Sequence, residues 1–166
     1  MYQHRYHSEN LSKTMKTSDL CDKHYSGPFP LSVCESGLLY DYGGVKAFHG
    51  PIQTVRCFEN NPFVRDTLTS PGHGRVLVVD GGGSKRCALL GDVLATMTYE
   101  NGWSGIVING CIRDSSMIQN IPIGVKALGV HPLKSIKKQE GESGCRLAFA
   151  GVKFVPYHWL YADEVR

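Results

Sequence analysis

The middle of the chain switches between continuous apolar runs and a helical spacing of apolar residues. Val76–Val79 is a short, mostly β-branched run that enters the glycine-rich turn at 80–83, which predicts a buried strand followed by a loop. Ile106–Ile108 is a second apolar run. Between them, apolar residues recur at the spacing of one helical face before Asn101-Gly102, namely at Leu90, Val93, Leu94 and Met97. A strand, a helix and a strand in this order predict parallel strands joined by a right-handed crossover.

Shorter elements are expected on both sides of this unit. On the N-terminal side we expect a helix capped by Thr17 or Ser18, breaks at Gly27–Pro30 and Gly43-Gly44, a strand over Ile52–Phe58 and a helix opened by Asn61-Pro62. On the C-terminal side we expect a helix that starts at Asp114 and ends by Ile121-Pro122, a strand over Val125–Val130, a turn at Gly141–Gly144 and one or two strands within Leu147–Val155. No repeat is visible, so the pattern predicts an α/β fold in a single domain.

Polar residues stand where α/β proteins build binding sites. Asp92 lies near the start of the predicted central helix, and Arg113-Asp114 follows the second strand after twenty intervening residues. Ligands of parallel sheets bind at the carboxyl ends of the strands. We therefore expect a helix start, an arginine and a carboxylate to converge on one crevice.

The chemistry of these groups suits a small α-keto acid. The first-turn amides of Gly91, Asp92, Val93 and Leu94 lack intrahelical acceptors and can bind a carboxylate. Arg113 can place its planar guanidinium on a carboxylate or enolate oxygen, and Asp114 can hold a hard divalent ion. The structural alternative is that Asp92 and Asp114 only cap helices and Arg113 is a solvated charge. Each residue taken singly is more often structural, but the pair at this spacing favours a site.

Several motifs resemble those of the RraA-like family, and the resemblance runs from Thr17 to Asp163. The matching motifs are Asp80–Ser84, Gly91-Asp92, Asn109–Asp114 and Leu160–Asp163. This family includes regulators of ribonuclease E activity and 4-hydroxy-4-methyl-2-oxoglutarate aldolases. In the aldolase branch, an Asp, twenty spacers and Arg-Asp form the metal and pyruvate site, whereas the regulators tend to lose these acidic residues. This chain keeps them, which favours the enzyme.

The resemblance implies a role for each site residue. Asp114 would anchor Mg²⁺ or Mn²⁺, partly through water, and Arg113 would stabilise the pyruvate enolate. The backbone from Gly91 to Leu94 would hold the substrate carboxylate, and Asp92 would orient a catalytic water. Lys137 and Glu35 fall where aldolases of this group place supporting polar residues. A lysine in the Lys134–Lys138 cluster is more often surface charge, so these two stay outside the expected site.

The resemblance also implies an activity and an assembly. We expect a divalent-metal-dependent aldolase that cleaves a 4-hydroxy-2-oxo diacid to pyruvate, with oxaloacetate decarboxylation as a side activity. The alternative is a non-enzymatic regulator that binds a ribonuclease or RNA helicase complex. The expected fold is β/β/α swivelling-domain-like over 17–166, after a flexible N-terminal extension at 1–16. The expected assembly is a homotrimer or a dimer of trimers with sites at subunit interfaces, and its weak point is the short C-terminus at Glu164–Arg166.

Composition narrows the function classes. The chain has 166 residues, a net charge of +3 and 42% hydrophobic residues, and no apolar run approaches the length of a membrane span. The mild charge argues against direct nucleic-acid binding. Its six cysteines show no Cys-x-x-Cys pair, which indicates reduced thiols in a cytoplasmic protein. The turn after Asp80 contains no complete nucleotide-binding pattern, because Arg86 stands in place of the third glycine. Some relatives have been labelled demethylmenaquinone methyltransferases, but this sequence contains no cofactor-binding motif that would support that activity.

Overall fold

The computed structural model describes residues 16–24, 26–28 and 31–164, which belong to two compact units, 1–31 and 32–166. In the first unit, helix α1 (Thr17–His24) begins where the sequence predicts it and buries Leu20. Asp19 lies in its first turn and Lys23 in its last, an arrangement that favours the helix dipole. The expected extension at 1–16, apart from Lys16, and part of the expected break at Gly27–Pro30 lie outside the described residues.

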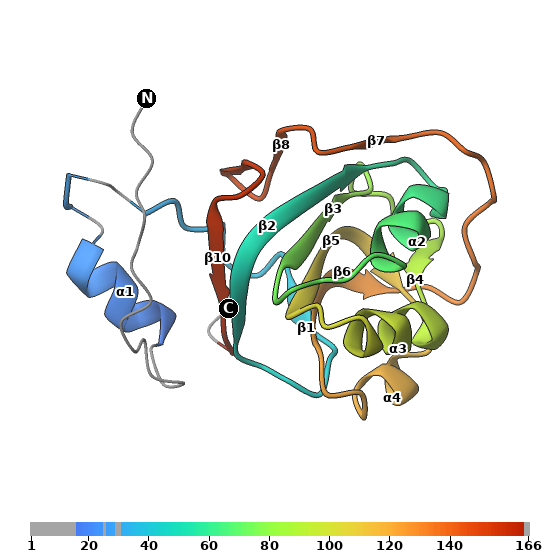
Figure 1. Cartoon of the computed structure of the whole chain (residues 1–166), viewed down its shortest axis with the longest axis horizontal. Coiled ribbons are helices and arrows are strands. Elements are labelled where there is room, and N and C mark those ends of the chain that lie inside the picture. The colour runs from blue at the N-terminus through green and yellow to red at the C-terminus, as the bar shows by residue number, and fades with distance from the viewer. Residues whose placement is uncertain (1–15, 25, 29–30, 165–166) are drawn as a thin grey trace. The chain divides into compact units, whose positions relative to one another are not determined.

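The second unit is built on a mixed sheet in which four neighbouring strands are parallel. The order along the sheet is β1-β6-β5-β3-β2-β10, with β4 beside β5 and β7 beside β2 (Figure 1). The strands are β1 (Tyr40–Asp41), β2 (Phe48–Arg56), β3 (Val76–Asp80), β4 (Ala88–Leu90), β5 (Gly105–Ile112), β6 (Gly124–Val130), β7 (Glu142–Ser143), β8 (Leu147–Phe149), β9 (Val152–Phe154) and β10 (Trp159–Ala162). The helices are α2 (Pro62–Leu68), α3 (Asp92–Glu100) and α4 (Ser115–Ile118).

The sheet is covered on both faces, which explains why its central strands are continuously apolar. Leu77 and Val79 of β3 pack in the core formed with α2, α3 and α4, whereas Val76 and Val78 pack in the core formed with the β8–β9 hairpin. All four side chains are fully buried. A strand buried on both faces cannot alternate apolar and polar residues. The observed layers are therefore hairpin, sheet and helices, a mixed α/β fold as expected.

The central strand–helix–strand unit is present with one correction. β3 and β5 are parallel neighbours, in register from Val76 opposite Gly105 to Asp80 opposite Asn109. Leu90, however, is not part of the helix but the last residue of β4, which continues beside β5 where β3 ends. Val93 is also misplaced by the periodicity, because its side chain is 66% exposed. The helix instead buries Leu94, Ala95 and Thr98, since its packing face is determined by the sheet below it.

The flanking predictions mostly agree with the structure. The helix at Asn61-Pro62, the strand near Val125–Val130 and the two late strands are confirmed as α2, β6, β8 and β9. The strand predicted over Ile52–Phe58 is shifted, because β2 spans Phe48–Arg56. The sequence pattern did not predict β1, β4 or β10.

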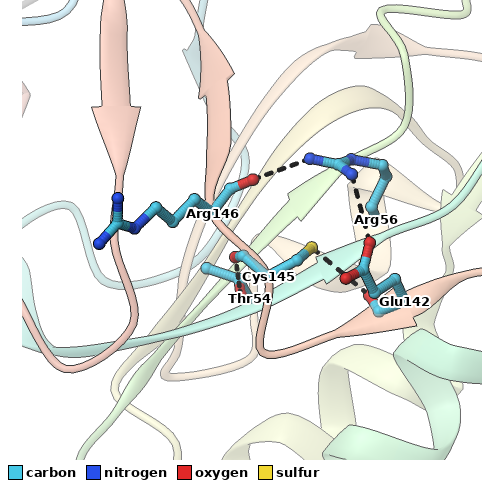
Figure 2. Close-up of polar contacts among 5 residues, drawn as sticks. All are labelled: Thr54, Arg56, Glu142, Cys145 and Arg146. Atoms are coloured by element: carbon cyan, nitrogen blue, oxygen red, sulfur yellow. Dashed lines mark hydrogen bonds and ion pairs between the residues drawn. The ribbon is translucent and has the colours of Figure 1, made fainter.

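The turn predicted at Gly141–Gly144 is wrong, because Glu142–Ser143 forms β7 against β2. Side chains of β2 hold this segment in place through hydrogen bonds, as Figure 2 shows. The Thr54 hydroxyl donates to the Cys145 carbonyl at 2.6 Å. Arg56 donates to the Glu142 carboxylate at 3.3 Å and to the Arg146 carbonyl at 2.8 Å. These contacts join residues far apart in sequence, so a local turn signal could not report them.

Two further features bear on chemistry. All six cysteines are free, as the spacing predicted. Lys126 on β6 is buried and its Nζ lies 2.8 Å from the Asp41 carboxylate on β1, which forms an ion pair across the edge of the sheet. In the described part of the chain, no helix has the length and apolar character that crossing a membrane requires.

Candidate active site at the carboxyl ends of the strands

Arg113 and Asp114 directly follow the last residue of β5. The Arg113 N–H donates to the Leu90 carbonyl at 2.9 Å, which ties this position to the end of β4. Asp114 has left-handed backbone angles, with φ 55° and ψ 36°. A non-glycine residue in this region costs on the order of 1 kcal/mol or more, and such residues concentrate at functional sites.

Asp114 begins α4 with its backbone and leaves its carboxylate for other contacts. Its carbonyl accepts the N–H groups of Met117 and Ile118, but its side chain makes no capping hydrogen bond. The carboxylate Oδ2 instead lies 3.2 Å from Arg113 Nε, and the two side chains are 37% and 40% exposed. The capping alternative for this carboxylate is therefore not what the structure shows.

Gly91 brings the start of α3 against the same pair. A Cβ placed on Gly91 would lie 2.9 Å from Asp114 Oδ2 and 3.1 Å from Arg113 Nε. The backbone of Gly91 is extended, with φ −126° and ψ −176°, a conformation open to any residue, so a side chain here would displace Arg113 and Asp114 without straining the backbone. The structure thus brings together a helix start, an arginine and a carboxylate, the three groups that the sequence placed at this edge of the sheet.

Asp92 and its neighbours require a refinement of the expected carboxylate-binding loop. Gly91, not Asp92, occupies the N-cap position of α3, and Asp92 is the first helical residue. The Val93 N–H donates to the carboxylate of Asp92 at 2.8 Å, so this amide already has an acceptor. Leu94 is 5% exposed and faces the core, so only its backbone can contribute to a site.

The segment after β6 forms the second side of the site. The His131 N–H donates to the Ile112 carbonyl at 2.8 Å, and the Ala88 N–H donates to the Leu133 carbonyl at 2.8 Å. The segment next crosses to the end of β2, where the Ile136 N–H donates to the Glu59 carbonyl at 3.1 Å. It therefore runs along β4 and delivers the following residue, Lys137, beside the start of α2.

Lys137 and Asn61 form a polar bridge that sequence analysis did not identify. Lys137 Nζ donates to Asn61 Oδ1 at 3.0 Å, and Asn61 Nδ2 donates to the Leu89 carbonyl at 2.9 Å, two residues before Gly91. Asn61 is buried and occupies the N-cap position of α2 without a side-chain capping bond. The sequence marked Asn61 only as a helix start, and nothing local indicated its lysine partner.

The electrostatic surroundings of this bridge are positive. Partial burial is the main cause that lowers the pKa of Lys137, and the positive charges of Arg65, Lys134 and Arg113 lower it further. Three cationic side chains therefore act electrostatically on Lys137, and one of them, Arg113, is paired with Asp114. Such a cluster is suited to a substrate that carries more than one negative charge. Lys137 is thus more closely associated with Arg113 than its place in a basic surface run suggested.

Glu35 and the glycine turn have structural surroundings of their own. The Glu35 N–H donates to the Ala150 carbonyl at 2.9 Å, and its side chain lies against Gly151, at the turn between β8 and β9. In the glycine turn, Asp80 Oδ1 accepts from the Gly82 N–H at 3.0 Å and from Asn109 Nδ2 at 2.8 Å. Gly82 and Gly83 have positive φ, which explains these glycines by backbone geometry.

Neither Arg113 nor Asp114 lines either of two hollows, of about 360 and 490 Å³, that other described residues form. Among the residues that the structure describes, no group of three or more His, Cys, Asp or Glu side chains could hold a metal ion. A metal at Asp114 would therefore depend on few protein ligands.

Comparisons with known proteins identify the family of this chain. The family model described as "RraA-like: Aldolase/RraA" matches residues 17–165. A protein of Alkalilimnicola ehrlichii named "Putative 4-hydroxy-4-methyl-2-oxoglutarate aldolase" is 52% identical over 151 residues, which cover 91% of each chain. Two solved structures each match with a TM-score of 0.85. One is a Geobacillus kaustophilus protein described as an S-adenosylmethionine: 2-dimethylmenaquinone methyltransferase, which is 49% identical, with 90% of each chain covered. The other is described as "the RNA-processing inhibitor RraA from Thermus thermophilis" and is 40% identical, with 92% of this chain and 90% of that one covered. This chain belongs to the RraA-like family.

Proposed function

We propose that this protein is a divalent-metal-dependent aldolase that cleaves a 4-hydroxy-2-oxo diacid, such as 4-hydroxy-4-methyl-2-oxoglutarate, into two molecules of pyruvate. The observation that carries the proposal is the contact of Gly91 with both Arg113 and Asp114. This contact places the Arg113 guanidinium, the Asp114 carboxylate and the start of α3 next to one another. The relative from Alkalilimnicola ehrlichii that is 52% identical bears the name of this activity.

The residues fit a Mg²⁺ or Mn²⁺ ion. Such ions are commonly held by one or two carboxylates, while water and substrate oxygens fill the other positions. Asp114 offers one partly exposed carboxylate, and Gly91, which has no side chain, lies beside its Oδ2. A divalent ion held there supplies Lewis-acid polarisation of the substrate's 2-keto oxygen.

Arg113 would stabilise the charge that develops in the reaction. When the bond between C3 and C4 of the substrate breaks, its electron pair moves toward the 2-keto oxygen and leaves a pyruvate enolate. Arg113 Nε lies beside Asp114, and the terminal guanidinium nitrogens have no partner among the described residues. They are donors that can meet the enolate oxygen, where a preorganised donor contributes most to the rate.

Asp92 would position the water that moves protons. One carboxylate oxygen of Asp92 holds the Val93 N–H, which leaves the other to orient a water molecule. That water takes the proton of the C4 hydroxyl as C4 becomes the carbonyl of the second pyruvate, and it returns a proton to C3 of the enolate. Atoms and charge therefore balance without a redox step. Oxaloacetate loses CO₂ through the same enolate, so its decarboxylation should accompany the aldolase reaction.

Two lysines bear on the competing Schiff-base mechanism. Lys126 is buried and its Nζ is paired with the Asp41 carboxylate at 2.8 Å, so this amine is engaged at the edge of the sheet. Lys137 is bound to Asn61 and surrounded by other cations. We assign it to substrate binding, since the positive cluster suits a dianionic diacid.

The test is turnover of both substrates by the purified protein. We expect pyruvate formation to disappear with EDTA and to return with Mg²⁺ or Mn²⁺. Full activity in chelator would overturn the metal role, and borohydride trapping of a lysine adduct would then identify an imine mechanism. No turnover of either substrate under any metal condition would overturn the aldolase proposal.

A second candidate is a regulator that binds a ribonuclease or RNA helicase complex. The observation in its favour is the match to the Thermus protein described as an RNA-processing inhibitor, at a TM-score of 0.85. An Arg113→Lys variant separates the two functions, because it should lose turnover but keep ribonuclease inhibition if both exist. Under either function we propose a homotrimer or a dimer of trimers, which light scattering would test, and a monomer at micromolar concentration would contradict it.

A further inference from the structure

Asn61 stands at the start of a helix but does not use its side chain there. It occupies the N-cap position of α2, where asparagine is common because its side chain can accept an N–H of the first turn. In this chain the side chain makes no capping hydrogen bond, and Asn61 is only 7% exposed. Buried polar groups are almost always hydrogen-bonded, so the other contacts of this amide must explain it.

Both ends of the Asn61 amide are bound to other elements. Nδ2 donates to the Leu89 carbonyl of β4 at 2.9 Å, and Oδ1 accepts from Lys137 Nζ at 3.0 Å. A carbonyl only accepts and an ammonium only donates, so one orientation of the amide satisfies both partners. Serine, threonine and aspartate also serve as N-caps, but none carries a donor and an acceptor on two separate atoms. The bridge therefore explains an asparagine that the helix alone does not require.

The Leu89 end of the bridge belongs to the framework of the proposed active site. The next carbonyl along β4, that of Leu90, accepts the Arg113 N–H at 2.9 Å. Gly91 follows, and a Cβ placed on it would lie 3.1 Å from Arg113 Nε. Asn61 is thus attached to the strand end that also holds the backbone of Arg113.

The Lys137 end of the bridge supplies an acceptor in positive surroundings. Partial burial is the main cause that lowers the pKa of Lys137, followed by the positive charges of Arg65 on α2, of Lys134 and of Arg113. A flexible, strongly hydrated lysine among like charges favours solvent. Asn61 Oδ1 is a neutral acceptor, so it holds the ammonium without cancelling the charge that a carboxylate of the substrate would meet.

We propose that Asn61 is a positioning residue, which holds the Lys137 ammonium at the end of β4 so that it meets a carboxylate of the diacid in one orientation. The inference rests on the proposed function, because that function names the diacid. Asn61 acts through Lys137 and not on the substrate itself. Since Lys137 is assigned to binding in the ground state and the transition state alike, loss of Asn61 should change KM more than kcat.

The first variant is Asn61→Ser, which keeps an N-cap side chain and removes both contacts. In the full chain with saturating Mg²⁺, we expect KM for 4-hydroxy-4-methyl-2-oxoglutarate to rise about three- to tenfold, the effect of one partly exposed, charge-assisted hydrogen bond. Added to Lys137→Met, the same substitution should raise KM little further, because the effects of two residues that act as one unit do not add.

Asn101→Ser is the matched control. Asn101 Nδ2 donates to the Leu68 carbonyl at 2.6 Å, the same kind of contact, but Asn101 lies at the C-cap of α3, at the opposite end of that helix from Gly91. This variant should lower the melting temperature through the lost hydrogen bond and leave KM at its wild-type value.

A second variant, Asn61→Asp, gives a readout that a purely structural role would not move. It keeps the size of the side chain and the acceptor for Lys137, and it keeps the test decisive if the serine variant does not fold. A carboxylate beside Lys137 raises the pKa of the ammonium, so the alkaline limb of the pH–rate profile should move upward. The same carboxylate offsets one positive charge of the cluster, so KM should rise as well.

The outcomes separate this inference from the proposed function. No turnover by the wild-type protein would overturn the proposed function and this inference with it. With an active wild type, the inference alone is overturned by wild-type KM in Asn61→Ser, by an equal rise of KM in Asn101→Ser, by additive effects of Asn61→Ser and Lys137→Met, or by an unmoved alkaline limb in Asn61→Asp.

Discussion

Replacing Gly91 with alanine adds one methyl group beside Arg113 and Asp114 and so tests whether the reaction needs the observed positions of these two side chains. The added Cβ would lie 2.9 Å from Asp114 Oδ2 and 3.1 Å from Arg113 Nε, whereas unstrained non-bonded contacts of carbon lie near 3.5 Å. Both side chains must therefore move by roughly half an ångström. Displacement of about 1 Å at reacting groups can cost about a hundredfold, so we expect Gly91→Ala to lower kcat/KM roughly ten- to hundredfold.

The same substitution should not destabilise the fold. The Gly91 backbone, at φ −126° and ψ −176°, is open to alanine. Alanine also restricts the unfolded chain, which stabilises a protein by about 0.4–1 kcal/mol where the backbone is compatible. We therefore expect the melting temperature to stay constant or rise slightly while turnover of oxaloacetate and 4-hydroxy-4-methyl-2-oxoglutarate falls. The assay is steady-state pyruvate release at saturating Mg²⁺, together with thermal unfolding of the same samples.

Gly129→Ala is the matched control. A Cβ there would meet only Cys111 Sγ, at the ordinary distance of 3.7 Å. It should leave both turnover and melting temperature near those of the wild type. Wild-type turnover in Gly91→Ala would refute the reasoning, because Arg113 and Asp114 would then not need their observed positions. A loss of turnover with an equal loss in Gly129→Ala would refute it as well.

Four further results are expected. Arg113→Lys keeps the charge but loses the planar donor fork, so turnover should fall roughly 10²–10³-fold at every Mg²⁺ concentration. The turnover of Asp114→Asn should instead be partly restored by excess Mg²⁺. Equal restoration of both variants would contradict separate roles for the two residues. Lys134→Gln should raise KM for the diacid with little change in kcat, more strongly at low salt, whereas a change in kcat alone would argue against substrate binding. Because its surroundings lower the pKa of Lys137, activity that needs its ammonium should decline on the alkaline side below the range of an ordinary lysine, and Lys137→Arg should move that limb upward in a pH–rate profile. Cys57, whose pKa is raised to about 12, should resist iodoacetamide at pH 8 in the folded protein, and mass spectrometry that finds rapid labelling there would show that the thiol is not buried as described.

Local pattern was sufficient for the elements whose signal is carried by their own residues. The run Val76–Val79 is apolar because both faces of β3 are covered. Four consecutive apolar residues are enough to indicate such a strand. Pro62 at the start of α2 and the position of Arg113-Asp114 after a strand are likewise local facts. Because parallel strands end at one edge of the sheet, these facts were enough to place the helix start, the arginine and the carboxylate together.

Tertiary structure alone decided which groups pair across long separations. Leu90 belongs to β4 because β5 offers it a hydrogen-bonding edge, although its spacing fits a helix. Glu142 pairs with Arg56 across 86 positions, and Lys137 reaches Asn61 across 76. A period or motif reports only the neighbourhood of a residue along the chain, whereas these contacts depend on how the sheet brings distant segments together. The sequence by itself therefore placed Gly91, Arg113 and Asp114 in the proposed site, and the fold decided that Lys137 pairs with Asn61 and that Asn61 contacts the Leu89 carbonyl two residues before Gly91.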